Sequence, residues 1–385
     1  MTAKIPKHWK IKTLGEIANI SSGTTPFRKN PLFYDNADIP FVKTTDLNNS
    51  YITTTEEKVS MYALNNTSLR LYPTNTVLVA MYGGFNQIGR TGKLAMEATI
   101  NQALSALVLK NDDVNSDYLL FWLNANVEKW KRFAGSSRKD PNINGKDVAE
   151  FSILIPSLEE QEKIAEILLT CDKAIRLTTQ IITQLKQRNQ GLAQQLLTGK
   201  KRVKGFENSV WKEVRLGDLL DYEQPTNYLV KNTDYSDEYK TPVLTAGKTF
   251  ILGYTNEKEG ICTKIPLILF DDFTTDSRYI DFSFKVKSSA VKLLKAKKNA
   301  NLRFIFEAMK LIKYAIGGHE RHWISKYAFL TIFVPSFKGQ NAIAQILDTT
   351  HQELKLYEQK LQLLQAQKKT LMQKLLTGEV LTIKK

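Results

Sequence analysis

Residues 155–199 read IPSLEEQEKIAEILLTCDKAIRLTTQIITQLKQRNQGLAQQLLTG, and residues 334–378 read VPSFKGQNAIAQILDTTHQELKLYEQKLQLLQAQKKTLMQKLLTG. In both copies a mostly apolar set of positions advances in strict steps of four and three residues, which is the spacing of a coiled-coil seam. The first copy places in this seam Ile164, Leu168, Cys171, Ile175, Thr178, Ile182, Leu185, Asn189, Leu192 and Leu196. The sequence therefore predicts two long helices, over about residues 159–198 and 338–377, which end at Gly199 and Gly378.

The two predicted helices share one heptad phase, so each can cover the apolar seam of the other. An antiparallel pair places Asn189 near Thr350 and Cys171 near Lys368, so most polar seam residues meet polar neighbours. A parallel pair would instead place Asn189 against Lys368. We therefore predict that the helices pair antiparallel, as a pseudo-twofold repeat requires.

Each helix follows a globular segment that opens with a tryptophan. Residues 9–17 read WKIKTLGEI and residues 211–219 read WKEVRLGDL, a shift of 202 positions (211 minus 9). The helices are shifted by only 179 positions (334 minus 155), so the second repeat is shorter between its tryptophan and its proline. The predicted organisation is a globular domain over 1–157, a helix over 158–199, a linker and second globular domain over 200–336, a second helix over 337–378 and a tail over 379–385.

The two globular middles show mixed α/β patterns. Candidate strands in the first are residues 39–44, 76–82 and 104–109, followed by a helix over 117–133. Those in the second are residues 242–245, 266–270 and 282–286, followed by a helix over 301–316. We predict an α/β (α+β) fold in which two mixed α/β domains are separated by two long antiparallel coiled-coil helices.

The composition indicates a folded, basic protein. Of its 385 residues 42% are hydrophobic, and 54 Lys and Arg against 39 Asp and Glu give a net charge of +15, which favours nucleic acid as the partner. The cysteines, Cys171 and Cys262, form neither a disulfide framework nor a CxxC pair. The sequence contains neither a secretion signal nor an apolar run long enough to span a membrane, so we expect a cytoplasmic protein.

Three motifs resemble catalytic or metal sites, and each is incomplete. GFNQIGRT at residues 84–91 has P-loop glycine spacing but an arginine in place of the phosphate-binding lysine, which favours a turn between strands. DEYK at residues 237–240 contains the carboxylate-carboxylate-x-lysine element of metal-dependent nucleases without a preceding Pro-Asp pair. His319 and His322 lack a third ligand, so loop histidines near phosphate are favoured. We predict no catalytic residue, no metal site and no cofactor bound by this chain.

Polar and basic turns recur in corresponding places of the two middles, and they supply the candidate DNA contacts. Arg, Lys, Asn and Gln side chains can bond base edges, whereas Thr, Ser and Lys can hold phosphates. The candidates in the first middle are Lys43, Thr44, Thr45, Tyr82, Asn86, Gln87, Arg90, Arg138, Lys139 and Asn142. Those in the second are Thr245, Lys248, Thr249, Arg278, Tyr279, Arg321, His322 and Trp323. Because the two sets differ, a palindromic target is disfavoured.

These residues resemble the specificity (S) subunit of type I restriction-modification systems over nearly the whole chain. The resemblance rests on the WKIKTLGEI opening, GTTP at 23–26, DIPF at 38–41 and PSLEEQ at 156–161 before a heptad helix that ends in LLTG. PVLTAGK at 242–248 and FDDFT at 270–274 look like the family's second recognition domain. The second helix start departs from the pattern, with FKGQ at 337–340, which predicts a weaker contact there.

The resemblance implies a non-catalytic DNA-binding subunit with two target-recognition domains that read an asymmetric bipartite target in double-stranded DNA. It implies two methyltransferase (M) subunits and restriction (R) subunits as partners, with S-adenosylmethionine and ATP/Mg on those partners rather than on this chain. A coiled-coil scaffold that binds proteins and a metal-dependent nuclease are the alternatives. A steep salt dependence of affinity for duplex DNA would separate a DNA reader from a scaffold, and metal-dependent cleavage by the purified chain would indicate a nuclease.

Overall fold

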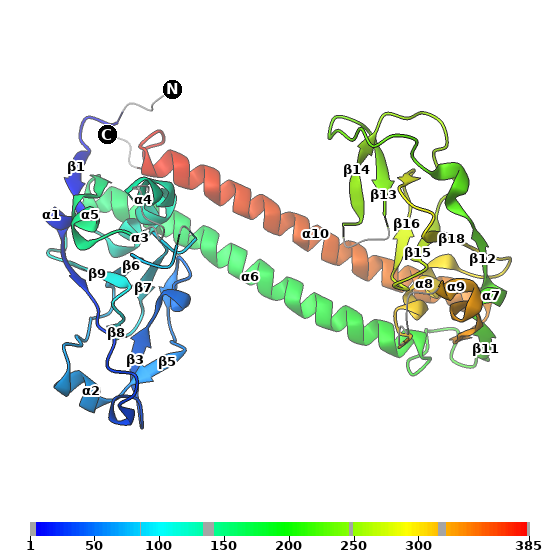
Figure 1. Ribbon diagram of the computed structural model, residues 1–385, viewed down its shortest axis with the longest axis horizontal. Helices are drawn as coiled ribbons and strands as arrows, with labels where there is room; N and C mark the ends of the chain where they lie inside the picture. The colour runs from blue at the N-terminus through cyan, green and yellow to red at the C-terminus, as the bar shows by residue number, and fades with distance from the viewer. Residues whose placement is uncertain (1–4, 85, 134–141, 246–248, 315–320, 383–385) are drawn as a thin grey trace. The chain divides into compact units, whose positions relative to one another are not determined.

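The structure is a computed structural model that describes residues 5–84, 86–133, 142–245, 249–314 and 321–382. Its chain divides into two compact units (Figure 1). Unit 1 comprises residues 1–179 and 360–385, and unit 2 comprises residues 180–359. Each unit therefore contains one globular middle together with the start of one long helix and the end of the other.

The described part of unit 1 holds a five-stranded sheet of order β2-β9-β6-β7-β4, a three-stranded sheet of order β5-β3-β8 and the pair β1-β10. The strands are β1 (Lys10–Thr13), β2 (Ala18–Ser22), β3 (Ile39–Val42), β4 (Tyr51–Ile52), β5 (Glu57–Val59), β6 (Val77–Ala80), β7 (Thr91–Leu94), β8 (Thr99–Ile100), β9 (Leu104–Leu109) and β10 (Ser152–Ile155). The helices are α1 (Leu14–Ile17), α2 (Met61–Asn66), α3 (Ser116–Ala125), α4 (Val127–Phe133) and α5 (Gly145–Glu150), with 3-10 turns η1 (Pro31–Phe33) and η2 (Thr44–Asp46).

The described part of unit 2 holds a four-stranded sheet of order β12-β18-β15-β16, a three-stranded sheet of order β14-β13-β17 and the pair β11-β19. The strands are β11 (Lys212–Arg215), β12 (Leu220–Glu223), β13 (Thr241–Leu244), β14 (Ile251–Thr255), β15 (Leu267–Asp271), β16 (Ser277–Ile280), β17 (Lys285–Val286), β18 (Val291–Ala296) and β19 (Thr331–Val334). The helices are α7 (Leu216–Leu219), α8 (Leu302–Met309) and α9 (His322–Ser325), with 3-10 turns η3 (Pro225–Tyr228) and η4 (Tyr327–Phe329).

The two units share a common plan that extends into their middles. The antiparallel sets β2-β9-β6 and β12-β18-β15 correspond, as do the parallel pairs β3-β8 and β13-β17. Even close backbone approaches recur. A Cβ added to Gly15 would lie 3.2 Å from the Ala149 Cβ, and one added to Gly217 would lie 3.3 Å from the Ala328 Cβ. The internal repeat therefore holds beyond the segments whose sequences match.

All six predicted strands are present, three of them shortened, two shifted by one residue and one unchanged, but both predicted middle helices needed correction. The helix expected over 117–133 breaks at Asn126, whose side-chain amide donates to the Trp122 carbonyl at 2.8 Å, and so divides into α3 and α4. The helix expected over 301–316 ends at Met309, because the amides of Leu311 and Ile312 bond carbonyls only three residues back. Such tight turns close a helix rather than extend it.

The two long helices, α6 (Leu158–Leu197) and α10 (Phe337–Leu376), begin and end within one residue of the prediction. In unit 1 the start of α6 and the end of α10 share a hydrophobic core through Ile164, Leu168, Leu375 and Leu376. In unit 2 the end of α6 and the start of α10 share a core through Leu196, Ile343 and Leu347. The helices therefore run antiparallel in both units. Among the described residues, no helix is both long and apolar enough to cross a membrane.

The polar seam residues meet as the antiparallel prediction requires. The Asn189 side-chain amide donates to the Thr350 carbonyl at 3.0 Å, and both residues are buried. The Lys368 ammonium pairs with Asp172, the residue next to Cys171. The alternative contact, Asn189 against Lys368, requires parallel helices and is excluded because the helices run antiparallel within each unit and each residue has one of these other partners. The predicted antiparallel register is confirmed.

Each long helix ends next to the tryptophan that opens the other repeat: α10 ends near Trp9 and α6 ends near Trp211. Gly199 and Gly378 adopt left-handed φ angles of 68° and 72°, which confirms the predicted glycine caps. A Cβ added to Gly378 would lie 3.5 Å from the Trp9 ring, and one added to Gly199 would lie 3.4 Å from the Trp211 ring. Each globular middle is thus completed by the last turn of the helix from the other repeat.

A buried glutamine anchors the start of each long helix to the globular middle. The Gln161 Oε1 accepts from the Asn115 amide at 2.9 Å, and its Nε2 donates at 3.1 Å to the carbonyls of Asp113 and of the preceding proline. Gln340 repeats two of these bonds, with the Asn301 amide at 2.9 Å and the preceding proline carbonyl at 3.1 Å. The glutamine of the Pro-x4-Gln motif is therefore a structural anchor.

The second helix start makes fewer side-chain contacts, as its departure from the pattern predicts. In the first copy Glu160 pairs with His8 at 3.0 Å and bonds the hydroxyl of Ser157 at 3.2 Å. In the second copy Gly339 occupies the position of Glu160, and only its backbone amide reaches Ser336. The glycine removes the equivalent of the pair with His8.

Gly191 offers a stabilising substitution on the exposed side of α6. A Cβ added there has no neighbour within 4 Å. Because glycine costs a helix interior up to about 1 kcal/mol relative to alanine, Gly191→Ala should raise the free energy of unfolding by several tenths to about 1 kcal/mol. Denaturant titration of the variant beside the wild type measures this change, and a loss of stability would contradict the structure of α6 at this position.

Candidate nucleic-acid interface

Four polar turns of unit 1 meet at one end of its sheets. The first turn follows β3, the second follows β6, the third precedes β9 and the fourth precedes α5. We call their described residues the unit 1 loop cluster, which comprises residues 43–46, 82–84, 86–90, 101–103 and 142–143. Three backbone hydrogen bonds tie them: Asn101 N to Val42 O at 3.0 Å, Met81 N to Ala103 O at 2.8 Å and Ile143 N to Met81 O at 3.0 Å.

The corresponding turns of unit 2 are tied by the same three bonds. These are Lys287 N to Leu244 O, Asp272 N to Ala290 O and His322 N to Asp272 O, each at 2.9 Å. We call the described residues 245, 249–250, 272–278, 287–290 and 321–322 the unit 2 loop cluster. Loops up to 100 positions apart in unit 1 (143 minus 43) and up to 77 positions apart in unit 2 (322 minus 245) therefore assemble in the same way.

The glycine-rich motif at 84–91 forms a turn between strands, as its incomplete P-loop pattern favours. It joins β6 to the antiparallel strand β7, with no helix after it, so it lacks the strand-to-helix context of a P-loop. A Cβ on Gly89 would lie 2.6 Å from the Trp130 ring, which explains why only glycine fits against that side chain. Tyr82 and Asn86 are exposed, and the Arg90 guanidinium donates to the Gln87 amide oxygen at 3.0 Å. Three potential base-reading groups thus share one hairpin.

Lys43, by contrast, is engaged within the protein. Its ammonium lies 2.9 Å from Glu56 and 3.3 Å from Glu57, and Arg28 also binds Glu57. The hydrogen bond to Glu56 raises the pKa of Lys43. Burial pushes the pKa of Glu57 upward, but hydrogen bonds from Arg28 and Lys43 outweigh it and leave that pKa below its usual range. A phosphate contact by Lys43 has to compete with these carboxylates, whereas the neighbouring Thr45 is exposed.

In unit 2 the structure brings three of the predicted turns together. The Arg278 guanidinium lies 5.5 Å from the centre of the Phe250 ring, next to the exposed Thr249, and 3.3 Å from the Asp276 carboxylate. Arg321 is exposed, and it belongs to the same cluster because the amide of the following residue, His322, bonds the Asp272 carbonyl. Arg278, Thr249 and Arg321 therefore remain candidates for DNA contacts.

Three predicted contacts of unit 2 need correction, because the side chains of His322 and Trp323 point into the protein and that of Tyr279 is half-buried on the face away from the loop cluster. His322 and Trp323 are fully buried, and Trp323 packs edge-on against Phe270 with ring centres 5.2 Å apart. Tyr279 alternates with Arg278 along β16 and so packs on the opposite face, 5.7 Å from the Phe306 ring, where burial raises its pKa. None of these side chains reaches the surface of the loop cluster.

The remaining candidates are in part outside the described residues. Arg138, Lys139 and Lys248 lie there, as does His319 of the weighed metal pair. Asn142 and Thr245 are half-buried members of the loop clusters. In the described ranges no group of three His, Cys, Asp or Glu side chains could hold a metal, and Asp237 and Glu238 are exposed.

Sequence reasoning missed the central turn of each cluster. Asn101, Gln102 and Ala103 lie between the other turns of unit 1, and Gln102 is exposed and bonds Thr25 of the GTTP segment. The equivalent turn of unit 2 presents an exposed Lys287 and Ser289. A short polar interruption between two strands was the available signal for both turns.

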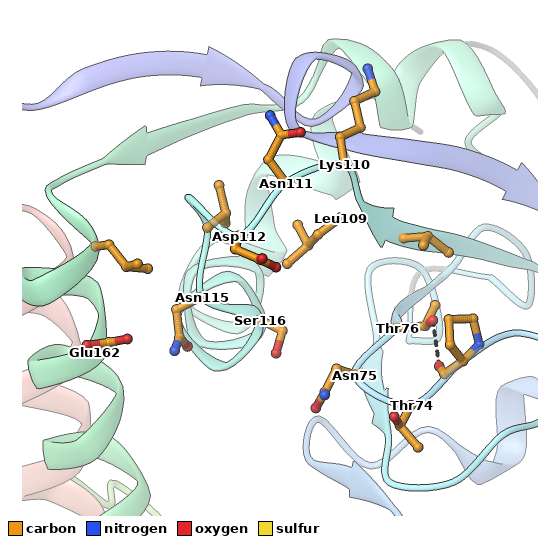
Figure 2. Close-up of a pocket in the computed structure, with 14 residues that line it drawn as sticks. Thr74, Asn75, Thr76, Leu109, Lys110, Asn111, Asp112, Asn115, Ser116 and Glu162 are labelled. Atoms are coloured by element: carbon orange, nitrogen blue, oxygen red, sulfur yellow. Dashed lines mark hydrogen bonds between the residues drawn. The ribbon is translucent and has the colours of Figure 1, made fainter.

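A separate cleft lies at the opposite ends of β6 and β9 in unit 1 (Figure 2). It has a volume of about 510 Å³ and is bordered by the turn before β6, the segment after β9 and the starts of α3 and α6. Figure 2 shows Asn115 and Ser116 of the α3 start facing it, with Glu162 of α6 at its edge. A cleft of about 800 Å³ occupies the corresponding place in unit 2. The unit 1 cleft contains none of the candidate contacts, so it is distinct from the loop cluster.

The comparisons with known proteins agree with this arrangement. The family model described as the type I restriction modification DNA specificity domain matches residues 6–187 and 208–366. The specificity subunit of the type I restriction enzyme EcoR124I/EcoR124II from Escherichia coli is 47% identical over 146 residues, which are 34% of this chain and 36% of that protein. The MjaIX specificity subunit from Methanocaldococcus jannaschii is 32% identical over 234 residues, 59% of this chain and 51% of that protein. The chain thus matches about a third and about half of the lengths of these two relatives.

Solved structures share the fold over nearly the whole chain. The S subunit of a type I restriction-modification system from M. genitalium has a TM-score of 0.67 at 16% identity, covering 98% of this chain and 97% of that one. The HsdS subunit from Thermoanaerobacter tengcongensis has a TM-score of 0.52 at 14% identity, covering 98% of each chain. Since the family model matches both halves, the chain belongs to the family of type I restriction modification DNA specificity proteins.

Proposed function

We propose that this chain is the non-catalytic, sequence-reading subunit of a type I restriction-modification complex. Each loop cluster reads one half of an asymmetric bipartite target in double-stranded DNA. One observation carries the proposal: the same three backbone hydrogen bonds assemble the turns in both units, while the side chains on those turns differ. A shared frame with different surface groups suits two readers of different half-sites, because base edges are distinguished by side-chain chemistry.

The partners follow from the same proposal. Two methyltransferase subunits bind the chain, and restriction subunits complete the assembly. S-adenosylmethionine and ATP/Mg bind to those partner subunits, and the chain itself binds neither cofactor. The net charge of +15 supplies salt-dependent attraction to phosphates, and a few loop side chains, each worth about 1 to 3 kcal/mol, supply the sequence preference.

Domain exchange tests the proposal. Replacing residues 10–155 with the equivalent segment of another specificity subunit should change one half-site and leave the other intact. Methylation-site mapping in a host that carries the M subunits reads both half-sites at once, with the wild-type chain as the control. A change in both half-sites contradicts the division of labour. Absence of sequence-selective DNA binding, with a flat salt dependence, favours the protein-binding scaffold instead.

We expect the long helices to set the number of unread base pairs between the two half-sites. They are continuous over 40 residues each and enter both units, so they set the unread gap, which we expect to be about 6 or 7 base pairs. Inserting four residues after Gln190 adds about 6 Å of helix and should lengthen the gap by one or two base pairs. Methylation mapping gives the new gap. Unchanged spacing combined with new half-site letters would show that the helices do not set the distance.

A further inference from the structure

A buried ion pair lies at the edge of the unit 2 loop cluster. Asp272 follows the last residue of β15, and Lys292 is the second residue of β18. Both side chains are 1% exposed, and the Lys292 ammonium lies 3.1 Å from the Asp272 Oδ2. The same ammonium donates to the Gln224 amide oxygen at 3.0 Å. Removing two opposite charges from water is costly, so such a pair calls for a specific explanation.

Asp272 holds the approach to α9 by two separate hydrogen bonds. Its backbone carbonyl accepts from the His322 amide at 2.9 Å, and its carboxylate Oδ1 accepts from the Trp323 amide at 2.8 Å. The residue that precedes α9, Arg321, makes no side-chain cap of its own. The N-terminal amides of α9 are therefore capped by a strand end 51 residues earlier in the chain. This bond fixes where the exposed Arg321 leaves the core.

The neighbouring turn is fixed from the same strand end. The Asp271 Oδ1 accepts from the Phe273 amide at 2.9 Å, and its Oδ2 accepts from the Thr274 hydroxyl at 2.6 Å. The Asp271 amide donates to the Asp276 carbonyl at 2.8 Å. Asp271 thus shapes the turn that leads to Arg278, while Asp272 positions the segment around Arg321.

Unit 1 builds the same junction without an ion pair. The strand registers place Met81 in the position of Asp272 and Ser105 in the position of Lys292. Met81 keeps the backbone bond, accepting from the Ile143 amide at 3.0 Å, but it has no carboxylate to offer. The following helix, α5, is capped instead by its own Asn144, which accepts from the amides of two later residues at 2.8 and 3.1 Å. The fold itself therefore does not require the ion pair.

We propose that Asp272 is a positioning residue for reading the second half-site, and that Lys292 neutralises the buried charge of its carboxylate. The inference rests on the proposed function. The carboxylate acts through the segment around Arg321 rather than by touching DNA, because it is buried. His322 lies against the same junction, with its Nδ1 3.2 Å from the Tyr314 hydroxyl and its Nε2 buried without a hydrogen-bond partner among the described residues. Because Asp272, His322 and Trp323 are all buried, Asp272 can influence DNA only through the position of exposed residues such as Arg321.

Two double variants separate the capping bond from the charge pair. Asp272→Met with Lys292→Ser installs the unit 1 residues and removes both. Asp272→Asn with Lys292→Met keeps an oxygen acceptor for the Trp323 amide and removes the charges. Hydrogen exchange of the peptide spanning residues 321–326 reports the cap without DNA. Selection from randomised duplexes by the full chain with its M subunits reports the base preference at each half-site.

For the Met/Ser variant we expect at least tenfold faster exchange of the 321–326 peptide and at least tenfold weaker discrimination at the second half-site. The first half-site should keep its preference within twofold. The Asn/Met variant should stay within twofold of wild type in all three measurements, which a merely charge-dependent stabilising role would not allow.

The proposal is overturned if the Met/Ser variant reads the second half-site as the wild type does, or if the Asn/Met variant loses as much discrimination. Loss of exchange protection throughout unit 2 in the Met/Ser variant would also overturn it, by showing that the fold needs the pair. If the wild-type chain selects no bipartite sequence, the proposed function fails instead. The exchange measurement still tests the Asp272 cap in that case.

Discussion

Replacing Gly23 by alanine should abolish reading of the first half-site and leave the second untouched. A Cβ at this position would lie 2.1 Å from the Ile100 carbonyl oxygen and 2.4 Å from that of Asn101. Neither carbonyl oxygen can easily move away from the added carbon. The Ile100 carbonyl accepts from the Thr24 amide, and Asn101 is tied through its own amide to the strand before Lys43. The substitution therefore displaces the central turn of the unit 1 loop cluster.

The cost in stability of Gly23→Ala should be large. Forcing one extra carbon into a packed region costs about 1 to 3 kcal/mol, and here the obstacle is backbone, so we expect about 3 kcal/mol or more from unit 1. Hydrogen exchange resolved by peptide separates unit 1 from unit 2, and methylation mapping reads the half-sites. Gly145→Ala is the matched control, since a Cβ there has no neighbour within 4 Å and should change stability by less than about 0.5 kcal/mol. Equal effects of the two substitutions would contradict the described packing of Gly23.

Replacing Gln161 by leucine should weaken unit 1 more than the equivalent change at Gln340 weakens unit 2. Gln161 makes three hydrogen bonds from a fully buried side chain, and among the described residues Gln340 makes two, with the Asn301 amide and the carbonyl of the preceding proline. Each buried group left unsatisfied costs about 1 to 3 kcal/mol, so we expect a loss of about 3 kcal/mol or more for Gln161→Leu and a smaller loss for Gln340→Leu.

The measurement for the glutamine variants is the free energy of unfolding from denaturant titration, with exchange used to assign the loss to a unit. Gln190→Leu serves as the control, because Gln190 is exposed on α6 and its replacement should change stability by no more than about 0.5 kcal/mol. A larger loss from Gln340→Leu than from Gln161→Leu would mean that the number of anchoring bonds does not govern these helix starts.

The long helices were predictable because their signal is local and repeated. Forty residues of heptad spacing fix the helical period, the seam and the glycine ends together, and polar residues such as Asn189 select the antiparallel partner. The six predicted strands were also found, because they are short apolar runs between polar turns, but others, such as β14 and β18, were not predicted. The break at Asn126 was missed, since the apolar face continues through it and does not indicate that the Asn126 backbone leaves the helical conformation, at φ −112° and ψ 20°.

The candidate interface was predictable only in part, because distant backbone bonds decide which turn residues face outward. The sequence around His322 reads as an exposed basic loop, yet the bonds of its amide and the next to Asp272 draw both side chains into the core. Tyr279 was misjudged because one residue of strand register separates the outer face from the inner one. Gln102 was overlooked since its turn is short, although it lies at the centre of the cluster.

The closure of unit 1 by the last turn of α10 has a consequence for biosynthesis. Leu375 and Leu376 complete the core that also contains Trp9, so this core cannot finish folding until residues 375 and 376 have been synthesised. The α6 seam, once synthesised, lacks its partner while residues 198–336 and then α10 itself are added. At about 5 to 20 residues per second, that interval lasts on the order of ten seconds. The nascent chain therefore exposes the apolar seam of α6 while it is still being synthesised. We expect chaperones to bind the emerging helix during that interval.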